Sequence, residues 1–208
     1  MVWHTVPALI QSLFPKRIWE GDATGNRVYL TFDDGPVPGV TDYVLEELAC
    51  RGQKATFFMV GDNIQKHPAL AREVLEAGNG IGNHTFHHLN GWKTSLTEYL
   101  ENIRDFDRIA ADRLGIQTQL FRPPYGMISR SQAKVVLETK KIVMWNVLTG
   151  DYERGIDPEV ILAKSIQLIQ SGSIVVLHDQ QKTQEILPKF LPDFLDFLSE
   201  REFETALL

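Results

Sequence analysis

The sequence contains one cysteine, no long apolar run and no glycine-rich phosphate loop. A single cysteine excludes an internal disulfide, and the apolar helical pattern around Cys50 predicts a buried, unreactive thiol. No apolar run approaches the length of a membrane-spanning helix, so stable membrane insertion is not expected. No Gly-x-Gly-x-x-Gly pattern or phosphate loop follows the first expected strand, so nothing indicates a nucleotide site.

An excess of positive charge is also missing. The 208 residues include 21 Lys and Arg against 27 Asp and Glu, which gives a net charge of −6. Nucleic acids and anionic membranes select clustered Lys and Arg, so neither is an expected partner. Neutral or cationic substrates fit better. The length suits one domain over residues 1–208, and we find no linker, repeat or low-complexity tract.

The first twenty residues do not resemble a signal peptide. They lack a basic start, and Gln11, Ser12 and Pro15 interrupt their apolar stretch. We therefore expect a cytoplasmic protein if this N-terminus is complete, and an exported one if a signal has been removed. Helical spacing instead predicts a small amphipathic helix within residues 1–20 that caps the domain, with its apolar positions at Val6, Leu9, Ile10, Leu13 and Phe14.

Short apolar runs alternate with helical patterns along the rest of the chain. We expect strands at Arg27–Phe32, Ala55–Val60, Gly80–Gly82, Gln119–Phe121, Ile142–Val147, Ser173–Leu177 and Phe203–Leu207. Helices are expected after Thr41, Pro68, Ser95 and Asp157, and over Leu187–Glu200 with Pro192 as a break or kink. Strands separated by helices predict a parallel sheet, either a nearly closed barrel or an open doubly wound sheet.

Polar clusters follow the C-terminal ends of the expected strands, where α/β barrels build their active sites. They are Asp33-Asp34, His84 to His88, Arg122 to Gly126, Asp151-Tyr152 and His178-Asp179. Taken alone, Asp-Asp-Gly-Pro could be a turn and the histidines a surface pair. Five such clusters on one rim favour a functional site over ordinary surface chemistry.

One carboxylate and two histidines are a usual ligand set for a catalytic zinc or similar divalent ion. His84 and His88 stand four positions apart, a spacing that suits one metal better than the adjacent His87 does. The remaining carboxylate of the Asp33-Asp34 pair would be free to act as a base on water at the metal. The pattern predicts a metal-dependent hydrolase.

These clusters resemble, in order, the five motifs of the polysaccharide deacetylases. The matching segments are Thr31-Phe32-Asp33-Asp34-Gly35-Pro36, His84-Thr85-x-x-His88, Arg122-Pro123-Pro124-Tyr125-Gly126, Asp151 and Leu177-His178-Asp179. The family includes chitin, chitooligosaccharide and peptidoglycan deacetylases and some acetylxylan esterases. The resemblance spans about residues 28–179. It implies a distorted (β/α) barrel of about seven parallel strands, with the active site at the C-terminal rim.

The resemblance also implies a role for each matching residue. Asp34, His84 and His88 would hold the metal, usually zinc, although some members prefer cobalt or another divalent ion. Asp33 would be the general base and His178 the general acid that protonates the departing amine.

Other matching residues would orient these groups and enclose the substrate. By resemblance, Arg122 orients Asp33, Asp151 orients His178, and the backbone N–H of Tyr125 stabilises the oxyanion. Leu177 is expected to help form the pocket for the acetyl methyl group. The family commonly has Trp after the matching Asp151; here Tyr152 replaces it and is expected to reshape the acetyl pocket or the sugar platform.

The expected activity is removal of N-acetyl groups from an amino-sugar carbohydrate of the chitin or peptidoglycan type, with release of acetate. Three alternatives remain open: an O-acetyl esterase acting on a polysaccharide such as xylan, an amidase acting on a small metabolite, and a carbohydrate-binding pseudoenzyme. Retention of both Asp33 and His178 argues against the pseudoenzyme, because binding alone would need neither.

Overall fold

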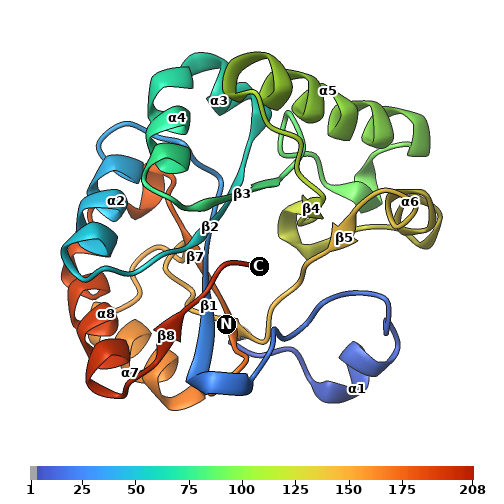
Figure 1. The fold of residues 1–208 in the computed structure, drawn as a ribbon. Helices are drawn as coiled ribbons and strands as arrows, with labels where there is room; N and C mark the ends of the chain where they lie inside the picture. Colours follow the sequence, from blue (N-terminus) through green and yellow to red (C-terminus); the bar gives the residue numbers. More distant parts are fainter. Residues whose placement is uncertain (1–3) are drawn as a thin grey trace.

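A computed structural model describes residues 4–208, which fold around a curled parallel β-sheet (Figure 1). The sheet order is β5-β4-β3-β2-β1-β7-β6, and β8 pairs with β1. With its surrounding helices, this curled sheet is the expected distorted (β/α) barrel. The strands are β1 (Arg27–Asp33), β2 (Thr56–Met59), β3 (Gly80–Asn83), β4 (Leu120–Phe121), β5 (Lys141–Ile142), β6 (Val147–Leu148), β7 (Ile174–His178) and β8 (Glu204–Thr205).

The central strands are buried on both faces, as their nearly continuous apolar sequences predict. β1 lies between β2 and β7, and the pairing register sets Asp33 opposite Phe58 on one side and opposite His178 on the other. Asp33 and His178 are 145 positions apart in sequence, yet they lie side by side at the C-terminal ends of neighbouring strands.

Helices cover the outside of the curled sheet, most of them where sequence signals predict. They are α1 (Ala8–Ser12), α2 (Thr41–Cys50), α3 (Gly61–Lys66), α4 (Pro68–Glu76), α5 (Leu96–Leu114), α6 (Arg130–Val136), α7 (Pro158–Leu168) and α8 (Leu191–Glu200). Ser95 accepts a hydrogen bond from the Glu98 N–H at the start of α5, and Gly115 ends that helix in the left-handed region. Pro192 lies in the first turn of α8 and does not kink it.

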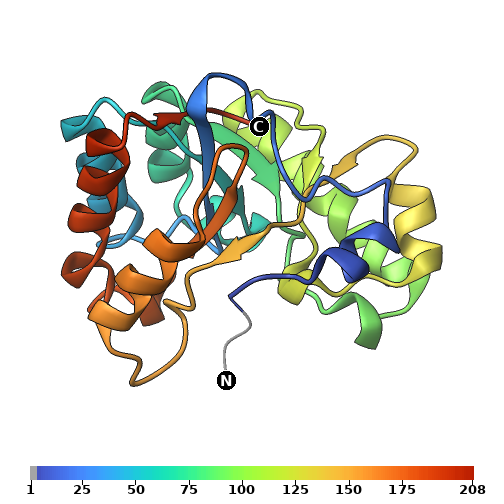
Figure 2. The same cartoon turned by 90° about the horizontal axis from the view of Figure 1, so that it is seen from below.

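Two clusters of buried side chains hold the sheet to its helices. The main core packs the strands against the apolar faces of α2, α7 and α8, and it includes Leu30, Phe57, Leu177, Phe194 and Leu198. The second core joins α5 and α6 to β4 and β5 and includes Trp19, Tyr99 and Phe121. Figures 1 and 2 agree in placing α2, α7 and α8 on one side of the molecule, with α1 and α6 on the other.

The prediction of one strand over Ile142–Val147 is wrong. This stretch supplies two strands at opposite edges of the sheet, and residues 143–146 cross the gap between them. Along the crossing, the Val143 N–H donates to Phe121, the Met144 N–H to Ile18 and the Asn146 N–H to Ile174. Three of the four side chains in the crossing are apolar because the segment is largely buried, so its pattern resembles that of a continuous strand.

Two further expectations need correction. The N-terminal helix extends only over Ala8–Ser12; Val6 and Phe14 pack against the second core, but Leu9 and Leu13 are exposed. Cys50 is exposed at the end of α2 rather than buried, because Leu48 is the residue of the last turn that faces the core while Cys50 faces solvent. The helical pattern identified the helix correctly but did not fix which residues face inward at its end.

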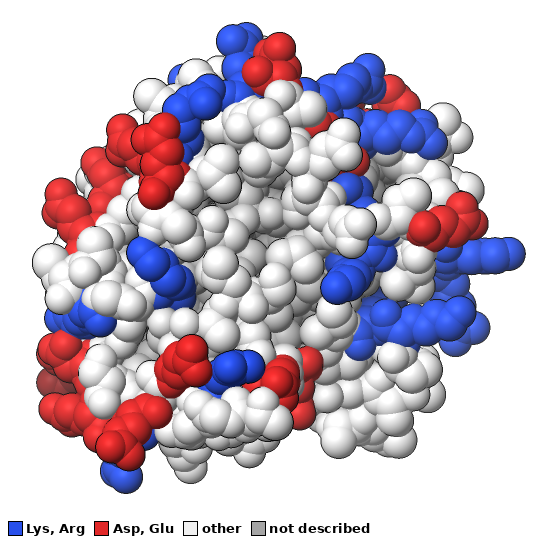
Figure 3. All heavy atoms as spheres, in the orientation of Figure 1, with Lys and Arg blue, Asp and Glu red and all other residues white. Residues whose placement is uncertain are grey.

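On the face seen in Figures 1 and 3, acidic and basic side chains lie around the edge, while the centre, where the C-terminal segment crosses, is largely uncharged. Among the helices of residues 4–208, none has both the length and the apolar character needed to span a bilayer.

Removing a large side chain from the main core should destabilise the fold. Phe194 of α8 is fully buried, so Phe194→Ala should lower the free energy of unfolding by about 3–5 kcal/mol through the cavity it leaves. Glu200→Ala, at an exposed position of the same helix, is the matched control and should change it by less than about 0.5 kcal/mol. Urea denaturation measures both. Equal losses would contradict the packing of α8 against this core.

Candidate active site

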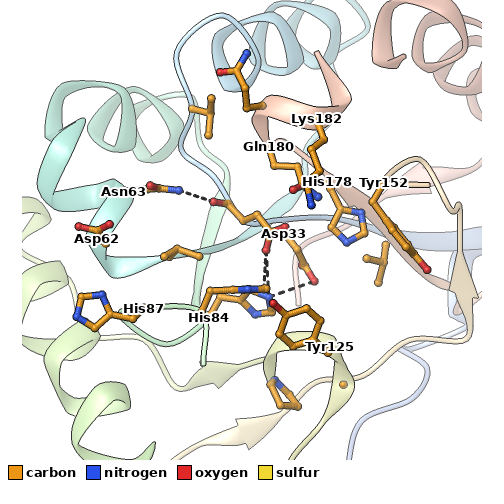
Figure 4. Close-up of a pocket in the computed structure, with 18 of the residues that line it drawn as sticks. Asp33, Asp62, Asn63, His84, His87, Tyr125, Tyr152, His178, Gln180 and Lys182 are labelled. Atoms are coloured by element: carbon orange, nitrogen blue, oxygen red, sulfur yellow. Dashed lines mark hydrogen bonds and ion pairs between the residues drawn. The ribbon is translucent and has the colours of Figure 1, made fainter. Parts of the chain in front are cut away.

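The predicted polar clusters meet in one cavity of about 650 Å³ at the C-terminal ends of the strands (Figure 4). Asp33 is the last residue of β1 and His178 the last residue of β7, while His84 follows β3 directly. Tyr125 lies in the short 3-10 helix η3 (Pro124–Gly126) after β4. Figure 4 shows Asp33 between His84 and His178, with Tyr125 at the lower side of the same cavity.

Asp34, His84 and His88 form a compact group of possible metal ligands. One donor atom from each lies within 4.8 Å of the others. The Nε2 atoms of His88 and His84 are 3.0 and 3.5 Å from Asp34 Oδ1. His87 lies outside this group; its ring contacts Phe86, and Figure 4 shows it apart from His84. The structure therefore groups His84 and His88 with Asp34 and leaves His87, which lies between them in sequence, outside the group.

The chemistry of this group fits a divalent metal ion. Asp34 Oδ1 is buried and accepts no hydrogen bond within residues 4–208, so the short contacts with the two imidazoles are not aligned as hydrogen bonds. The Nδ1 of His84 lies 2.7 Å from the Arg122 carbonyl, to which it can only donate, leaving the Nε2 lone pair directed at Asp34. An unpaired carboxylate oxygen and a free imidazole lone pair are metal donors.

Burial and neighbouring charges prepare these ligands. Burial lowers the pKa of His84 to about 4, although Asp33 opposes the shift, so the imidazole is neutral at pH 7 and can donate its lone pair. Burial alone would raise the pKa of Asp34, but His88, His178 and His84 hold it well below its usual range. The carboxylate is therefore ionised throughout the neutral range.

Asp33 is held away from the metal group by a buried arginine. The Oδ1 atom of Asp33 accepts a 2.7 Å hydrogen bond from Arg122 Nη1, and the Arg122 side chain is completely buried. Asp33 Oδ2 lies 3.9 Å from His84 Nε2. One oxygen is therefore fixed by the cation, and the other faces the cavity beside the ligands, where it can accept a proton.

His178 is held by a buried carboxylate. Asp151 Oδ1 lies 2.8 Å from His178 Nδ1, and Asp151 Oδ2 accepts a 2.8 Å hydrogen bond from the His178 backbone N–H. Burial opposes a charge on this ring, but the nearby Asp151 raises the pKa of His178 to about 9. The imidazolium form is therefore present at neutral pH, with its Nε2–H available as a proton donor.

Apolar and aromatic side chains form the wall around these polar groups. Tyr152 lines the cavity, with its ring centre 5.0 Å from that of His178, and the exposed Tyr125 ring lies 4.7 Å from that of His88. Leu177 does not line the cavity; it is buried in the main core. Because adjacent residues of a strand face opposite sides, Val176 shares the side of His178 and forms the wall together with Leu148.

Asparagine side chains, which sequence reasoning did not assign, fix the two ligand loops. Asn63 of α3 donates a 2.7 Å hydrogen bond to the Asp34 carbonyl (Figure 4). Asn83 accepts from the Thr85 N–H, and Asn102 of α5 accepts from the Phe86 and His87 N–H groups. Asn83 directly precedes the His84-to-His88 segment in sequence; the other two are brought to the site by the fold.

Strained backbone marks the same loops. Four of the six non-glycine residues with positive φ in residues 4–208 lie at this site, at Asp34 (83°), Thr85 (63°), His88 (54°) and Tyr125 (60°). Such conformations cost roughly 1–3 kcal/mol each and persist only where surrounding contacts impose them. The hydrogen bonds of Asn63 and Asn83 supply such contacts at Asp34 and Thr85, and Asn102 holds the two residues that precede His88.

Comparison with known proteins agrees with this geometry. The chain is 34% identical over 160 residues to the peptidoglycan-N-acetylglucosamine deacetylase PgdA of Listeria monocytogenes, covering 77% of this chain but only 34% of the Listeria protein. It is 35% identical over 176 residues to a chitooligosaccharide deacetylase of Bradyrhizobium, covering 80% of this chain and 77% of that protein. The chain therefore spans about a third of the length of PgdA.

Solved structures show the same fold. A crystal structure of a peptidoglycan N-acetylglucosamine deacetylase superposes with a TM-score of 0.86 at 30% identity, covering 95% of this chain and 94% of that one. A CE4 family pseudoenzyme from Bacillus anthracis gives 0.83 at 25% identity, covering 96% and 69%. The polysaccharide deacetylase profile matches residues 20–141, more than half of the chain, which includes Asp33, Asp34, His84, His88 and Arg122. The chain belongs to the polysaccharide deacetylase family.

Proposed function

We propose that the protein is a metal-dependent hydrolase that removes N-acetyl groups from amino-sugar carbohydrate of the chitin or peptidoglycan type and releases acetate. One observation carries this proposal. A carboxylate and a protonated imidazole, each fixed by its own buried partner, flank one Asp-His-His group in a single cavity. Hydrolysis of an amide needs these three elements together, because water must be activated and the amine must leave as a neutral molecule.

Asp34, His84 and His88 would hold the ion. Two imidazoles and one carboxylate are a usual ligand set for Zn²⁺, and Co²⁺ or another divalent ion is also compatible with it. When bound, such an ion would polarise the acetyl carbonyl and lower the pKa of a water molecule. Asp33 would remove a proton from the attacking water, and the hydrogen bond from Arg122 keeps its free oxygen directed into the cavity.

His178 would complete the reaction as the general acid. Water adds to the acetyl carbon, the bond between that carbon and nitrogen breaks, and the nitrogen takes the proton from His178 Nε2 as the amine leaves. Asp151 keeps the imidazole in the required orientation and stabilises its charged form. Asp33 then loses its proton and His178 regains one, by exchange through solvent, which returns both groups to their starting states; one water is consumed for each acetate released.

The remaining wall residues would position the acetyl group. The backbone N–H of Tyr125 is proposed to donate to the carbonyl oxygen as negative charge develops there. Val176, Leu148 and Tyr152 form the apolar part of the wall and would surround the acetyl methyl. Tyr152 adds a hydroxyl at the position where the family commonly has Trp, so it bears on the choice of sugar.

The names of two relatives support an N-acetylated amino sugar as substrate, since one is a peptidoglycan-N-acetylglucosamine deacetylase and the other a chitooligosaccharide deacetylase. Acetate release from chitooligosaccharides, peptidoglycan fragments and acetylxylan tests the proposal directly, with the Asp33→Asn protein as the blank. Release from acetylxylan alone would favour the O-acetyl esterase. If the metal-loaded protein releases acetate from none of the three but hydrolyses a small amide, the result would favour the metabolite amidase.

Metal binding and proton transfer should separate by mutation. His84→Ala and His88→Ala should each lose most of the bound ion and nearly all activity, because each removes one of three protein ligands. His87→Ala is the matched control from the same loop and should keep both the ion and the activity.

Asp33→Asn should keep the ion but lose about 10²–10⁴-fold in kcat, since an amide cannot accept the proton. Elemental analysis of the purified proteins, alongside the acetate assay, checks each outcome. Full metal content in both His84→Ala and His88→Ala would refute the site.

The pH profile should report His178. The acid must be protonated, so activity on the amide substrate should persist through neutral pH and fall as pH rises through the pKa of His178, which Asp151 raises to about 9. Asp151→Asn removes the charge that raises this pKa and leaves burial, which lowers it, so the alkaline limb of kcat/KM should move to lower pH. Hydrolysis of 4-nitrophenyl acetate should not shift in this way, because its leaving group needs no proton. An unshifted limb on the amide would exclude this role for His178.

The corrected wall predicts how acyl size is recognised. N-propionyl substrates should react more slowly than N-acetyl ones by roughly 10- to 200-fold, the usual cost of one added methylene in a packed pocket. Val176→Ala should narrow this difference, and Tyr152→Trp should change it. Leu177→Ala should leave the ratio unaltered but lower the free energy of unfolding by about 2–5 kcal/mol, because Leu177 belongs to the main core. The propionyl-to-acetyl ratio of kcat/KM is the measurement; a ratio altered only by Leu177→Ala would reverse this assignment.

A further inference from the structure

Trp92 presents a large aromatic side chain to solvent beside the active site. It lies in the 3-10 helix η2 (Gly91–Lys93), and 69% of its surface is exposed. A single exposed apolar side chain is common on protein surfaces and by itself indicates nothing. What distinguishes Trp92 is how firmly its ring is held.

Hydrogen bonds fix both the backbone and the ring of Trp92. Its backbone N–H donates to the Asn90 side chain at 3.0 Å, and its indole Nε1–H donates to the Ile128 carbonyl at 3.3 Å. The buried side chain of Gln132 donates to the carbonyls of Gly91, the first residue of η2, and Thr94, the residue that follows it. The polar atom of the indole is therefore occupied by protein, and the exposed part of the ring is its apolar surface.

The loop that carries Trp92 continues the wall of the cavity. It starts directly after the ligand His88, and the Gly91 N–H donates to the Met127 carbonyl, two residues beyond Tyr125. A Cβ on Gly91 would come within 2.5 Å of that carbonyl oxygen, so this close approach requires glycine. Tyr125 and Gly126 line the cavity on the same side. Trp92 thus lies on a loop that begins after His88 and is bonded to the segment just beyond Tyr125; both of those residues line the cavity, and Trp92 lies outside its lining.

We propose that Trp92 is the platform of an additional sugar subsite, which binds a neighbouring unit of the glycan while the acetylated unit occupies the cavity. This inference rests on the proposed function. A cavity of about 650 Å³ suits a ligand of one or two sugar rings, so a longer glycan must run over the rim. The flat C–H face of a pyranose is apolar and packs against an aromatic ring, while its hydroxyl groups remain in water.

The subsite would set the preference for longer substrates and would leave the rate of the chemical step unchanged. A two-unit substrate would not reach Trp92, whereas a five-unit substrate could gain the stacking contact. We expect loss of this stacking contact to weaken binding about tenfold, which corresponds to about 1.4 kcal/mol. Trp92→Ala should therefore lower the preference for five-unit over two-unit substrate by about tenfold.

The experiment compares wild type with Trp92→Ala, Trp92→Phe and a matched control, Leu96→Ala, which removes another exposed apolar side chain at the start of α5. For each protein, kcat/KM is measured on N-acetylglucosamine oligomers of two and five units and on 4-nitrophenyl acetate. Trp92→Ala should lose the length preference and keep ester hydrolysis. Trp92→Phe should keep most of the preference, and Leu96→Ala should keep all of it.

A binding measurement separates this proposal from the proposed activity. In the Asp33→Asn background, affinity for the five-unit oligomer, measured by calorimetry, should fall about tenfold on adding Trp92→Ala. This result stands even if wild type releases no acetate, in which case the deacetylase proposal alone fails. The subsite proposal is overturned if the five-unit oligomer does not bind, or if Trp92→Ala leaves its affinity unchanged. It is also overturned if Trp92→Ala slows hydrolysis of the ester and of both oligomers equally, since that pattern would indicate a disturbed His88 loop.

Discussion

Arg122 carries a positive charge that is completely enclosed by protein, and the site is arranged around it. Its Nη1 atom donates at 2.7 Å to both Asp33 and Thr31 of β1, and its Nη2 donates to the Met144 carbonyl at 3.0 Å. Its own carbonyl accepts from His84. Breaking a buried ion pair costs about 3–5 kcal/mol, so these partners are firmly imposed. One cation therefore ties the proposed base, a proposed metal ligand and the crossing that closes the barrel into a single unit.

Much of the fold could be predicted from local sequence signals, and the incorrect predictions have a common cause. Strands β1, β2, β3 and β7 and the helix after Ser95 were predicted because apolar runs, caps and glycines are local features. The crossing at residues 143–146 was not, because its hydrogen bonds go to Ile18, Phe121 and Ile174, which are distant in sequence. Burial alone makes such a segment apolar, and only the three-dimensional arrangement decides whether it forms a strand. The short helix α6 was overlooked although Ser129 and Gln132 form a capping box.

The polar residues of the site were more predictable than its wall. Motif residues at strand ends converge because parallel strands end on one edge, and this placed Asp33, His84 and His178 in one cavity. The wall depends on which alternate residue of a strand faces inward, so an error of one position moves a side chain to the opposite face. The resemblance predicted Leu177 in the cavity wall. The structure places its neighbour Val176 there and buries Leu177 in the main core. Asn63 and Asn102 carry no sequence signal, since their importance comes from the loops they meet.

The two buried histidines, His84 and His178, show how one cavity can contain both a proposed metal ligand and a proposed acid. Each is buried, which disfavours a charged ring, and each uses Nδ1 to contact one partner. His84 donates to the neutral carbonyl of Arg122, so burial prevails and its pKa falls to about 4. His178 faces the ionised Asp151, whose charge outweighs burial and raises its pKa to about 9. The same side chain is thus a neutral lone-pair donor in one place and a proton donor in the other, because a carboxylate replaces a carbonyl.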